Sequence, residues 1–252
     1  MRRLLPTHRD DLDLDAVFDR SERIGRSGRP WLMANMIMSV DGAFALDGRS
    51  GGMGSAADHQ MFHALRAACD AIFVAAGTAR QEGYRRPSTT DEDLAARRAA
   101  AGMGDAPALY LASRALDLPA DMPLRSGAGG TPTVLYPSGA DTAGVDADGI
   151  ALRAVPVEPG GIGIDLSAAL ESIAADGHRV VLCEGGPSLL GALQRHALLD
   201  ELFVSYSPVI AGGPQLGLMG RGPLEATPVR LTSLYEADGM LLADYLIEHP
   251  AG

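Results

Sequence analysis

The chain has 252 residues, of which 46% are hydrophobic, enough for one large α/β domain or two small ones with a sizeable core. Its formal net charge of −11 argues against a nucleic-acid-binding protein, because phosphate backbones are bound by a basic face. No apolar run reaches the length of about 18 residues that a membrane helix requires, and residues 1–9 lack the apolar segment of a signal peptide, so we expect a soluble cytoplasmic protein without a membrane partner.

The chain begins with a polar, charged stretch over residues 1–29, which predicts an N-terminal arm with one helical turn. From Trp31 on, apolar runs of strand length alternate with segments of helical spacing. Residues 89–106 are charged and alanine-rich and predict an exposed insertion or a short helix. Strands are expected at residues 32–40, 71–75, 108–112, 133–136, 150–155, 180–183 and 201–207, helices at 57–68, 166–175 and from 187, and a final antiparallel pair at 230–235 and 240–246. This order predicts one α/β domain over residues 30–252, with a mostly parallel central sheet, helices on both faces and a C-terminal antiparallel strand pair.

The most informative stretch is residues 180–193, VVLCEGGPSLLGAL. Its apolar run stops at Glu184-Gly185-Gly186, and Pro187 fits the first position of a helix. A glycine turn that leads into a helix offers free backbone N–H groups and the positive end of a helix dipole, which together bind anions. A tight β–α turn without a ligand has the same pattern. Glu184 favours a nucleotide phosphate site over a turn without a ligand, because a carboxylate beside an anion site is unfavourable unless it has a function of its own.

Small or polar residues also follow other expected strands. They are Asp41-Gly42, Gly77-Thr78 and Ser113. Taken singly, Asp41-Gly42 and Gly77-Thr78 are ordinary turn residues. Because ligands of parallel sheets gather at the carboxyl ends of the strands, their joint occurrence favours a binding cleft.

Several of these motifs together resemble the riboflavin-pathway pyrimidine reductases, which have a dihydrofolate-reductase-like fold. The resemblance covers residues 30–246, and its most specific part is EGGPSLL at residues 184–190. No zinc-deaminase signature precedes it, so the chain resembles the stand-alone reductase. The other matching segments are Asn35 with residues 39–42, Leu65-Arg66, residues 77–84, residues 199–202 and residues 208–213.

The resemblance implies an enzyme that uses NADPH to reduce the ribosylamino group of a pyrimidine 5′-phosphate to a ribitylamino group. It also implies a homodimer, which the apolar C-terminal strands support because their edge would be exposed without a partner. The implied cofactor residues are Gly77, Thr78, Ser113, Gly185, Gly186, Pro187, Ser188, Leu189 and Leu190, with the pyrophosphate at the helix start.

On the substrate side, the resemblance implies Asp41 and Glu184 as the catalytic carboxylates. Asp41 is expected to stabilise the charge that develops on the iminium group. Arginine suits the substrate phosphate because it can bind it bidentately. The implied substrate-binding residues are Asn35, Ser50, Arg66 and Glu82, with Arg85 or Arg86 on the phosphate.

Three further features are given plainer interpretations. His59 and His63 have a spacing that can bind a metal, but no third ligand is nearby, so we expect a solvated or cleft-facing pair and no metal. Residues 160–164, GGIGI, hint at a dinucleotide fingerprint but lack a good preceding strand, which predicts a loop. Cys69 and Cys183 lie far apart in apolar surroundings and predict buried thiols of a reducing cytosol.

Two other functions fit parts of the pattern. The first is a reductase of the same fold that acts on another substrate, such as a pterin. Met36 and Met38 favour it because they put bulky side chains near the expected nicotinamide, beside an unusually bare loop at residues 51–54. The second is a catalytically silent nucleotide-binding protein, against which the joint presence of Asp41, Thr78 and Glu184 argues.

Overall fold

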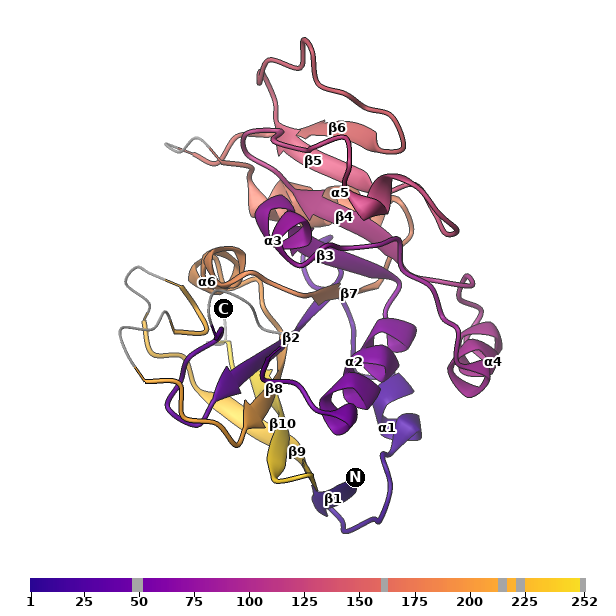
Figure 1. The fold of residues 1–252 in the computed structure, drawn as a ribbon, viewed down its shortest axis with the longest axis vertical. Coiled ribbons are helices and arrows are strands. Elements are labelled where there is room, and N and C mark those ends of the chain that lie inside the picture. The colour runs from indigo at the N-terminus through magenta and orange to yellow at the C-terminus, as the bar shows by residue number, and fades with distance from the viewer. Residues whose placement is uncertain (47–51, 160–162, 213–216, 221–224, 250–252) are drawn as a thin grey trace. The chain divides into compact units, whose positions relative to one another are not determined.

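The computed structural model describes residues 1–46, 52–159, 163–212, 217–220 and 225–249. The chain divides into two compact units, each assembled from segments that are far apart in the sequence (Figure 1). Unit 1 comprises Met1–Glu22, Leu32–Ala68 and Cys183–Gly252. Unit 2 comprises Arg23–Trp31 and Cys69–Leu182.

Unit 1 contains strands in the order β1-β9-β10-β8-β2. The pair β2–β8 is parallel, whereas β8–β10, β10–β9 and β9–β1 are antiparallel. The described residues of this unit also include three helices. The bounds are β1 (Arg2–Leu5), α1 (Leu14–Phe18), β2 (Trp31–Ser39), α2 (Ala56–Ala68), α6 (Pro187–Arg195), β8 (Glu201–Ser207), β9 (Val229–Ala237) and β10 (Met240–Ile247).

The parallel pairing of β2 with β8 brings the polar residues at the ends of these two strands to one edge of the sheet. Ser39, the last residue of β2, lies opposite Ser207, the last residue of β8, so both strands end at the same edge. On α2, Met61 and Leu65 are buried in the core. Arg66 is the residue of α2 that follows Leu65. It is only partly buried, because it lies at the border of the apolar face of the helix.

Unit 2 contains strands in the order β7-β3-β4-β5-β6. The pairs β3–β4, β4–β5 and β5–β6 are parallel, as expected for a chain that alternates strands with helices and connecting loops. The bounds are β3 (Ala71–Ala75), α3 (Ala76–Gln81), α4 (Glu92–Ala100), β4 (Ala108–Ala112), the 3-10 turn η1 (Pro123–Arg125), β5 (Thr133–Pro137), β6 (Ala151–Val155), α5 (Leu166–Ala175) and β7 (Val180–Cys183).

These elements confirm the predicted α/β architecture and the C-terminal antiparallel pair. Strands β4, β7 and β8 and helix α5 have the predicted bounds, and residues 89–106 contain the short helix α4. The turn expected at Gly77-Thr78 is wrong, because α3 begins at Ala76, directly after β3. One glycine costs a helix only about 1 kcal/mol relative to alanine, so residues 76–81 can be helical despite Gly77.

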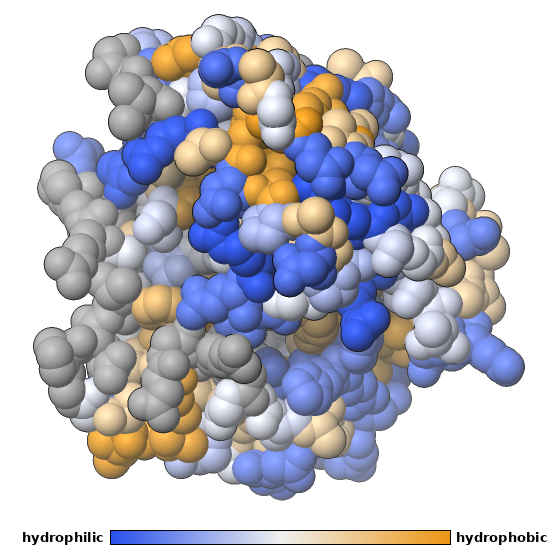
Figure 2. Space-filling view, turned by 45° about the horizontal axis from the view of Figure 1, so that its top comes forward, coloured by the Kyte–Doolittle hydropathy of each residue, from blue (hydrophilic) through white to orange (hydrophobic). Residues whose placement is uncertain are grey.

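The polar surface and the buried cysteines agree with what the composition predicts. On the face drawn in Figure 2, hydrophilic residues cover most of the described surface, and hydrophobic ones gather in separate patches. Within the described part of the chain, no helix is both long and apolar enough to cross a membrane. Cys69 and Cys183 are both buried and unbridged, as predicted. Burial raises the pKa of Cys183 to about 12, so its thiol is unreactive at neutral pH.

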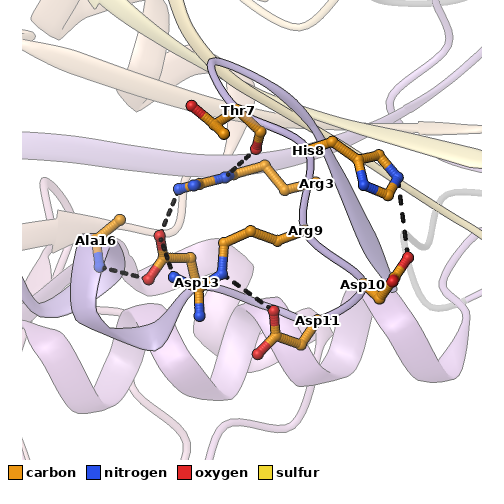
Figure 3. Close-up of polar contacts among 8 residues, drawn as sticks. All are labelled: Arg3, Thr7, His8, Arg9, Asp10, Asp11, Asp13 and Ala16. Atoms are coloured by element: carbon orange, nitrogen blue, oxygen red, sulfur yellow. Dashed lines mark hydrogen bonds and ion pairs between the residues drawn. The ribbon is translucent and has the colours of Figure 1, made fainter.

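Residues 1–22 of the N-terminal segment belong to unit 1. Arg3 and Asp13 form a buried ion pair, and Asp13 also accepts a hydrogen bond from the backbone N–H of Ala16 at the start of α1 (Figure 3). Arg3 and Arg2 belong to β1, which pairs with the end of β9 at Tyr235 and neighbouring residues. The prediction that the edge of the C-terminal strands is exposed is therefore wrong for the part of β9 that pairs with β1.

Candidate functional site

The glycine turn at residues 184–186 and the helix α6 that follows it lie in unit 1 and match the expected turn–helix pattern. Gly185 has a φ of +83°, and a Cβ placed there would lie 3.2 Å from the sulfur of Met36. Gly186 caps α6 and has no side chain that could bond the amides of the first turn. Pro187 occupies the first helical turn, and no acidic residue lies in that turn. The start of α6 therefore fits an anion, because its dipole and backbone donors are not opposed by a carboxylate on the helix.

Leucine side chains of α6 have a structural role. Leu189 and Leu190 are buried, and the N–H of Leu190 donates to the carbonyl of Gly186 at 3.0 Å. Of the cofactor residues predicted here, these two can contribute only through their backbone or through packing. Pro187 and Ser188 are the first two residues of α6.

A turn at residues 217–220 packs against α6, which the sequence did not predict. A Cβ at Gly191 would lie 2.1 Å from the carbonyl oxygen of Met219, and one at Gly220 would lie 3.0 Å from that of Pro187. Gly220 also has a φ of +69°. Glycine is therefore required at both positions for this close approach. A glycine inside a helix, at position 191, was the only sequence signal for the contact.

An ion pair joins two of the predicted substrate residues. The Nε and Nη2 atoms of Arg66 donate to the two carboxylate oxygens of Glu184, each at 2.7 Å. The Glu184 side chain is 2% exposed and that of Arg66 is 23% exposed. The arginine neutralises a carboxylate that would otherwise oppose an anion at the neighbouring turn. Phe62, missed from the sequence, lies one helical turn before Arg66, whose guanidinium carbon is 4.2 Å from the ring centroid.

Asp41 connects the ends of β2 and β8. Its Oδ1 accepts hydrogen bonds from the Ser39 hydroxyl at 2.6 Å and from the N–H of Ala211 at 3.0 Å, and its Oδ2 accepts one from the N–H of Gly212 at 2.7 Å. The Ser39 hydroxyl and these amides lower the pKa of Asp41 to about 2. The carboxylate is thus ionised at neutral pH and cannot act as a proton donor.

Asn35 lies in the middle of β2. Among the described residues, its side-chain oxygen is buried and has no hydrogen-bond partner. Buried carbonyl groups are nearly always hydrogen-bonded, so this oxygen can accept an N–H from a ligand. Ser50, the other predicted substrate residue of this segment, lies outside the described residues.

Unit 2 holds the remaining predicted cofactor residues. Gly77 and Thr78 lie in the first turn of α3, and the Thr78 carbonyl accepts from the N–H of Glu82, which ends the helix. Ser113 follows β4, and its hydroxyl accepts a hydrogen bond from the N–H of Leu116 at 3.0 Å. Ser113 is buried, and its turn fixes the chain where β4 ends.

The structure distinguishes the two candidate phosphate arginines. The Arg86 guanidinium donates to the carbonyls of Leu124, Arg125, Gly127, Gly129 and Gly149. Such a set of bonds anchors loops and leaves little donor capacity for a ligand. Arg85 is exposed. Arg80, which also lies in this stretch, pairs with Asp117.

The histidine pair remains at the surface. His59 and His63 are both exposed on α2. In the described ranges, no group of three or more His, Cys, Asp or Glu residues is placed to hold a metal ion.

Comparison with known proteins identifies the family. The family model described as the RibD C-terminal domain matches residues 30–242, most of the chain. The chain belongs to the RibD C-terminal domain family. The RibD C-terminal domain match includes β2, α2, the glycine turn and α6, and it confirms the resemblance predicted from the sequence.

Relatives of this RibD C-terminal domain chain include named reductases. A Methanothermobacter thermautotrophicus protein named 2,5-diamino-6-ribosylamino-4(3H)-pyrimidinone 5′-phosphate reductase is 28% identical over 185 residues, which are 73% of this chain and 81% of that protein.

Solved structures show the same fold. A pyrimidine reductase-like protein from Corynebacterium diphtheriae has a TM-score of 0.73 and 24% identity, over 88% of this chain and 93% of that one. The riboflavin biosynthesis reductase of Saccharomyces cerevisiae has a TM-score of 0.66 and 14% identity, over 93% and 97% of the two chains. These likenesses confirm the predicted dihydrofolate-reductase-like fold.

Proposed function

We propose that this protein uses NADPH to reduce the ribosylamino group of a pyrimidine 5′-phosphate to a ribitylamino group. The observation that carries the proposal is the RibD C-terminal domain match over residues 30–242. The name of the Methanothermobacter relative supports the same substrate class. The start of α6 supports a phosphate-bearing cofactor, because its first turn has the glycine cap and no acidic side chain.

The residues divide into a cofactor group and a substrate group. When bound, NADPH supplies the hydride. In this proposal, the backbone of Gly185 to Leu190 holds its pyrophosphate, whereas the cofactor roles of Gly77, Thr78 and Ser113 stay predictions from the resemblance. The chain contributes positioning more than acid–base chemistry, since Asp41 is ionised and held by three donors.

On the substrate side, Arg66 would bind the phosphate, and Asn35 would accept an N–H of the pyrimidine or of the cofactor amide. Asp41 would face the developing positive charge of the reacting imine. Glu82 and Ser50 stay predictions from the resemblance. We favour Arg85 over Arg86 as a second phosphate ligand, because Arg86 already donates to five backbone carbonyls.

The test is a direct assay of both ligands. Purified protein is titrated with NADPH and with NADH, and NADPH consumption is followed at 340 nm with the diamino pyrimidine phosphate and with its deaminated counterpart. We expect turnover with one of the two pyrimidines and tighter binding of NADPH. Absence of turnover with both would exclude the proposed reaction.

A reductase acting on another substrate is the second candidate. Met36 favours it, since its sulfur would lie 3.2 Å from a Cβ at Gly185 and it therefore narrows the space beside the turn. A pterin tested in the same assay distinguishes the two candidate functions, because only a pyrimidine reductase should prefer the pyrimidine phosphate to the pterin.

We also infer a homodimer. The covered edge of β9 removes one argument for it, but Leu231 on β9 and Leu241 on β10 remain exposed at 37% and 42%. These two leucines lie several positions apart in the pairing of β9 with β10 and do not form a patch, so the inference rests on the family resemblance. Light scattering at micromolar concentration should report a dimer, and a monomer would contradict the inference.

A further inference from the structure

The turn at residues 217–220 runs along the first half of α6 and contacts it through backbone atoms. The N–H of Gly220 donates to the carbonyl of Gly217 at 3.0 Å, which closes the turn. Gly191 is buried inside α6, and a Cβ on it would overlap the carbonyl oxygen of Met219. A side chain at position 191 would therefore push the turn away from the helix, because a backbone carbonyl cannot move aside as a flexible side chain can.

Gly220 lies over the peptide bond that begins α6. A Cβ on Gly220 would be 3.0 Å from the oxygen and 3.1 Å from the carbon of the Pro187 carbonyl, and 3.2 Å from the nitrogen of Ser188. Because these three distances are nearly equal, Gly220 faces the flat side of this peptide and not the edge from which the N–H projects. A peptide unit is planar, so the turn restrains the direction of the Ser188 N–H when it restrains that plane.

The N–H groups of Ser188 and Leu189 are the donors that α6 can offer to an anion. The next amide, that of Leu190, donates to the carbonyl of Gly186 at 3.0 Å. The two amides before it have no acceptor inside the helix. An amide that already points at its ligand binds more tightly than one that must first be oriented, because less freedom is lost on binding.

We propose that the turn at residues 217–220 positions the start of α6 for the cofactor pyrophosphate, with Gly191 and Gly220 as positioning residues that act through the backbone. The inference rests on the proposed function, because it takes NADPH as the ligand of the helix start. It adds a segment that follows β8 to the cofactor site. It also gives a reason for a glycine inside α6, where alanine is the better helix former.

The test compares NADPH with adenosine 2′-monophosphate, which keeps the adenine, the ribose and the 2′-phosphate but has no pyrophosphate. Gly220→Ala and Gly191→Ala should each raise the Kd for NADPH about tenfold, as expected when a charge-assisted hydrogen bond is weakened. The Kd for adenosine 2′-monophosphate should stay unchanged in both variants. A loss of affinity for both ligands would overturn the proposal, because it would show a general disturbance of the cofactor site.

Two other glycines provide matched controls. Gly217 belongs to the same turn, but within the described part of the chain a Cβ there would meet nothing within 4 Å, so Gly217→Ala should bind NADPH as the wild type does. Gly239 has a φ of +78°, close to the +69° of Gly220, and the nearest atom to a Cβ there is 3.8 Å away. Gly239→Ala should therefore lower the thermal midpoint through backbone strain and leave NADPH affinity unchanged. An equal loss of NADPH affinity in Gly239→Ala and Gly220→Ala would overturn the proposal, since strain alone would then explain it.

Hydrogen exchange tests the same coupling in the wild-type protein and does not depend on the folding of any variant. If the turn strengthens cofactor binding, bound NADPH must stabilise the turn against α6 by the same factor. Exchange of the amides at residues 217–220 should therefore slow by up to about tenfold at saturating NADPH. Adenosine 2′-monophosphate should not slow it. Exchange that NADPH leaves unchanged would contradict the proposed role of the turn.

The wild type is titrated with NADPH before any variant. A wild type that does not bind NADPH would refute the cofactor of the proposed function, and the role of the turn with it. A wild type that binds NADPH, with Gly220→Ala and Gly191→Ala of unchanged affinity, would refute only the role of the turn.

Discussion

Removal of the Arg66 side chain should destabilise the fold, since Glu184 depends on it. In Arg66→Ala, a carboxylate that is 2% exposed loses the two donors that both lie 2.7 Å from its oxygens. Breaking a buried ion pair by deleting one partner typically costs about 3–5 kcal/mol. Arg66 is 23% exposed, so water can enter from its side and the lower value applies.

The expected change in unfolding free energy is therefore about 3 kcal/mol. For a chain of this size, 1 kcal/mol shifts the thermal midpoint by about 2–4 °C, so Arg66→Ala should melt about 6–12 °C below the wild type. Differential scanning calorimetry measures this shift.

A matched control is available on α4. Arg97 pairs with Asp93 at 3.3 Å, one helical turn away, and the Asp93 side chain is 65% exposed. Such surface pairs contribute about 0.3–0.5 kcal/mol, so Arg97→Ala should shift the midpoint by at most about 2 °C. If Arg66→Ala has the same thermal midpoint as Arg97→Ala, the buried ion pair does not stabilise the fold as argued. The double variant Arg66→Met/Glu184→Gln should recover much of the loss, because no buried charge is left unpaired.

Three further predictions concern the turn and the strand ends. Gly186→Asp puts a negative charge at the start of α6, so NADPH affinity in a fluorescence titration should fall at least tenfold with the fold intact; unchanged affinity would remove the cofactor from this turn. Asp41, with a pKa lowered from 3.8 to about 2, should stabilise the fold fully above pH 3.8 and lose that effect as the pH falls toward 2. Midpoints measured from pH 5 to 2 should show this loss in the wild type and not in Asp41→Asn, and parallel curves would contradict it. Gly191→Ala should lower the thermal midpoint although alanine favours helices, because its Cβ would lie 2.1 Å from the Met219 oxygen, and a higher midpoint would show that the turn can move away.

Local patterns in the sequence predicted much of the fold. The apolar run at residues 180–183, the glycine pair and Pro187 led directly to β7 and α6, because turn and helix-start signals act over a few neighbouring residues. The helix α3 was missed because Gly77 suggested a turn, although one glycine does not prevent a helix. Strand β1 was missed because its pairing with β9 joins residues at opposite ends of the chain.

The candidate site was predictable in its members and not in their contacts. Arg66 and Glu184 were both expected near the substrate, but their pairing joins residues 118 positions apart, which no local periodicity encodes. The donors to Asp41 from residues 211 and 212 are backbone N–H groups, which carry no residue-type signal. The role of Arg86 was hidden for the same reason, since all five of its acceptors are backbone carbonyls.

The way the chain is divided between the units has a consequence for synthesis at the ribosome. All segments of unit 2 have been synthesised once residue 182 is added, so this unit can fold while translation of unit 1 continues. Strand β2, by contrast, is translated early but must wait for β8, whose residues lie about 170 positions later. During this interval an apolar strand is exposed without its partner, and such strands are prone to aggregate. The yield of folded protein should therefore depend on how quickly the segment between β2 and β8 is translated.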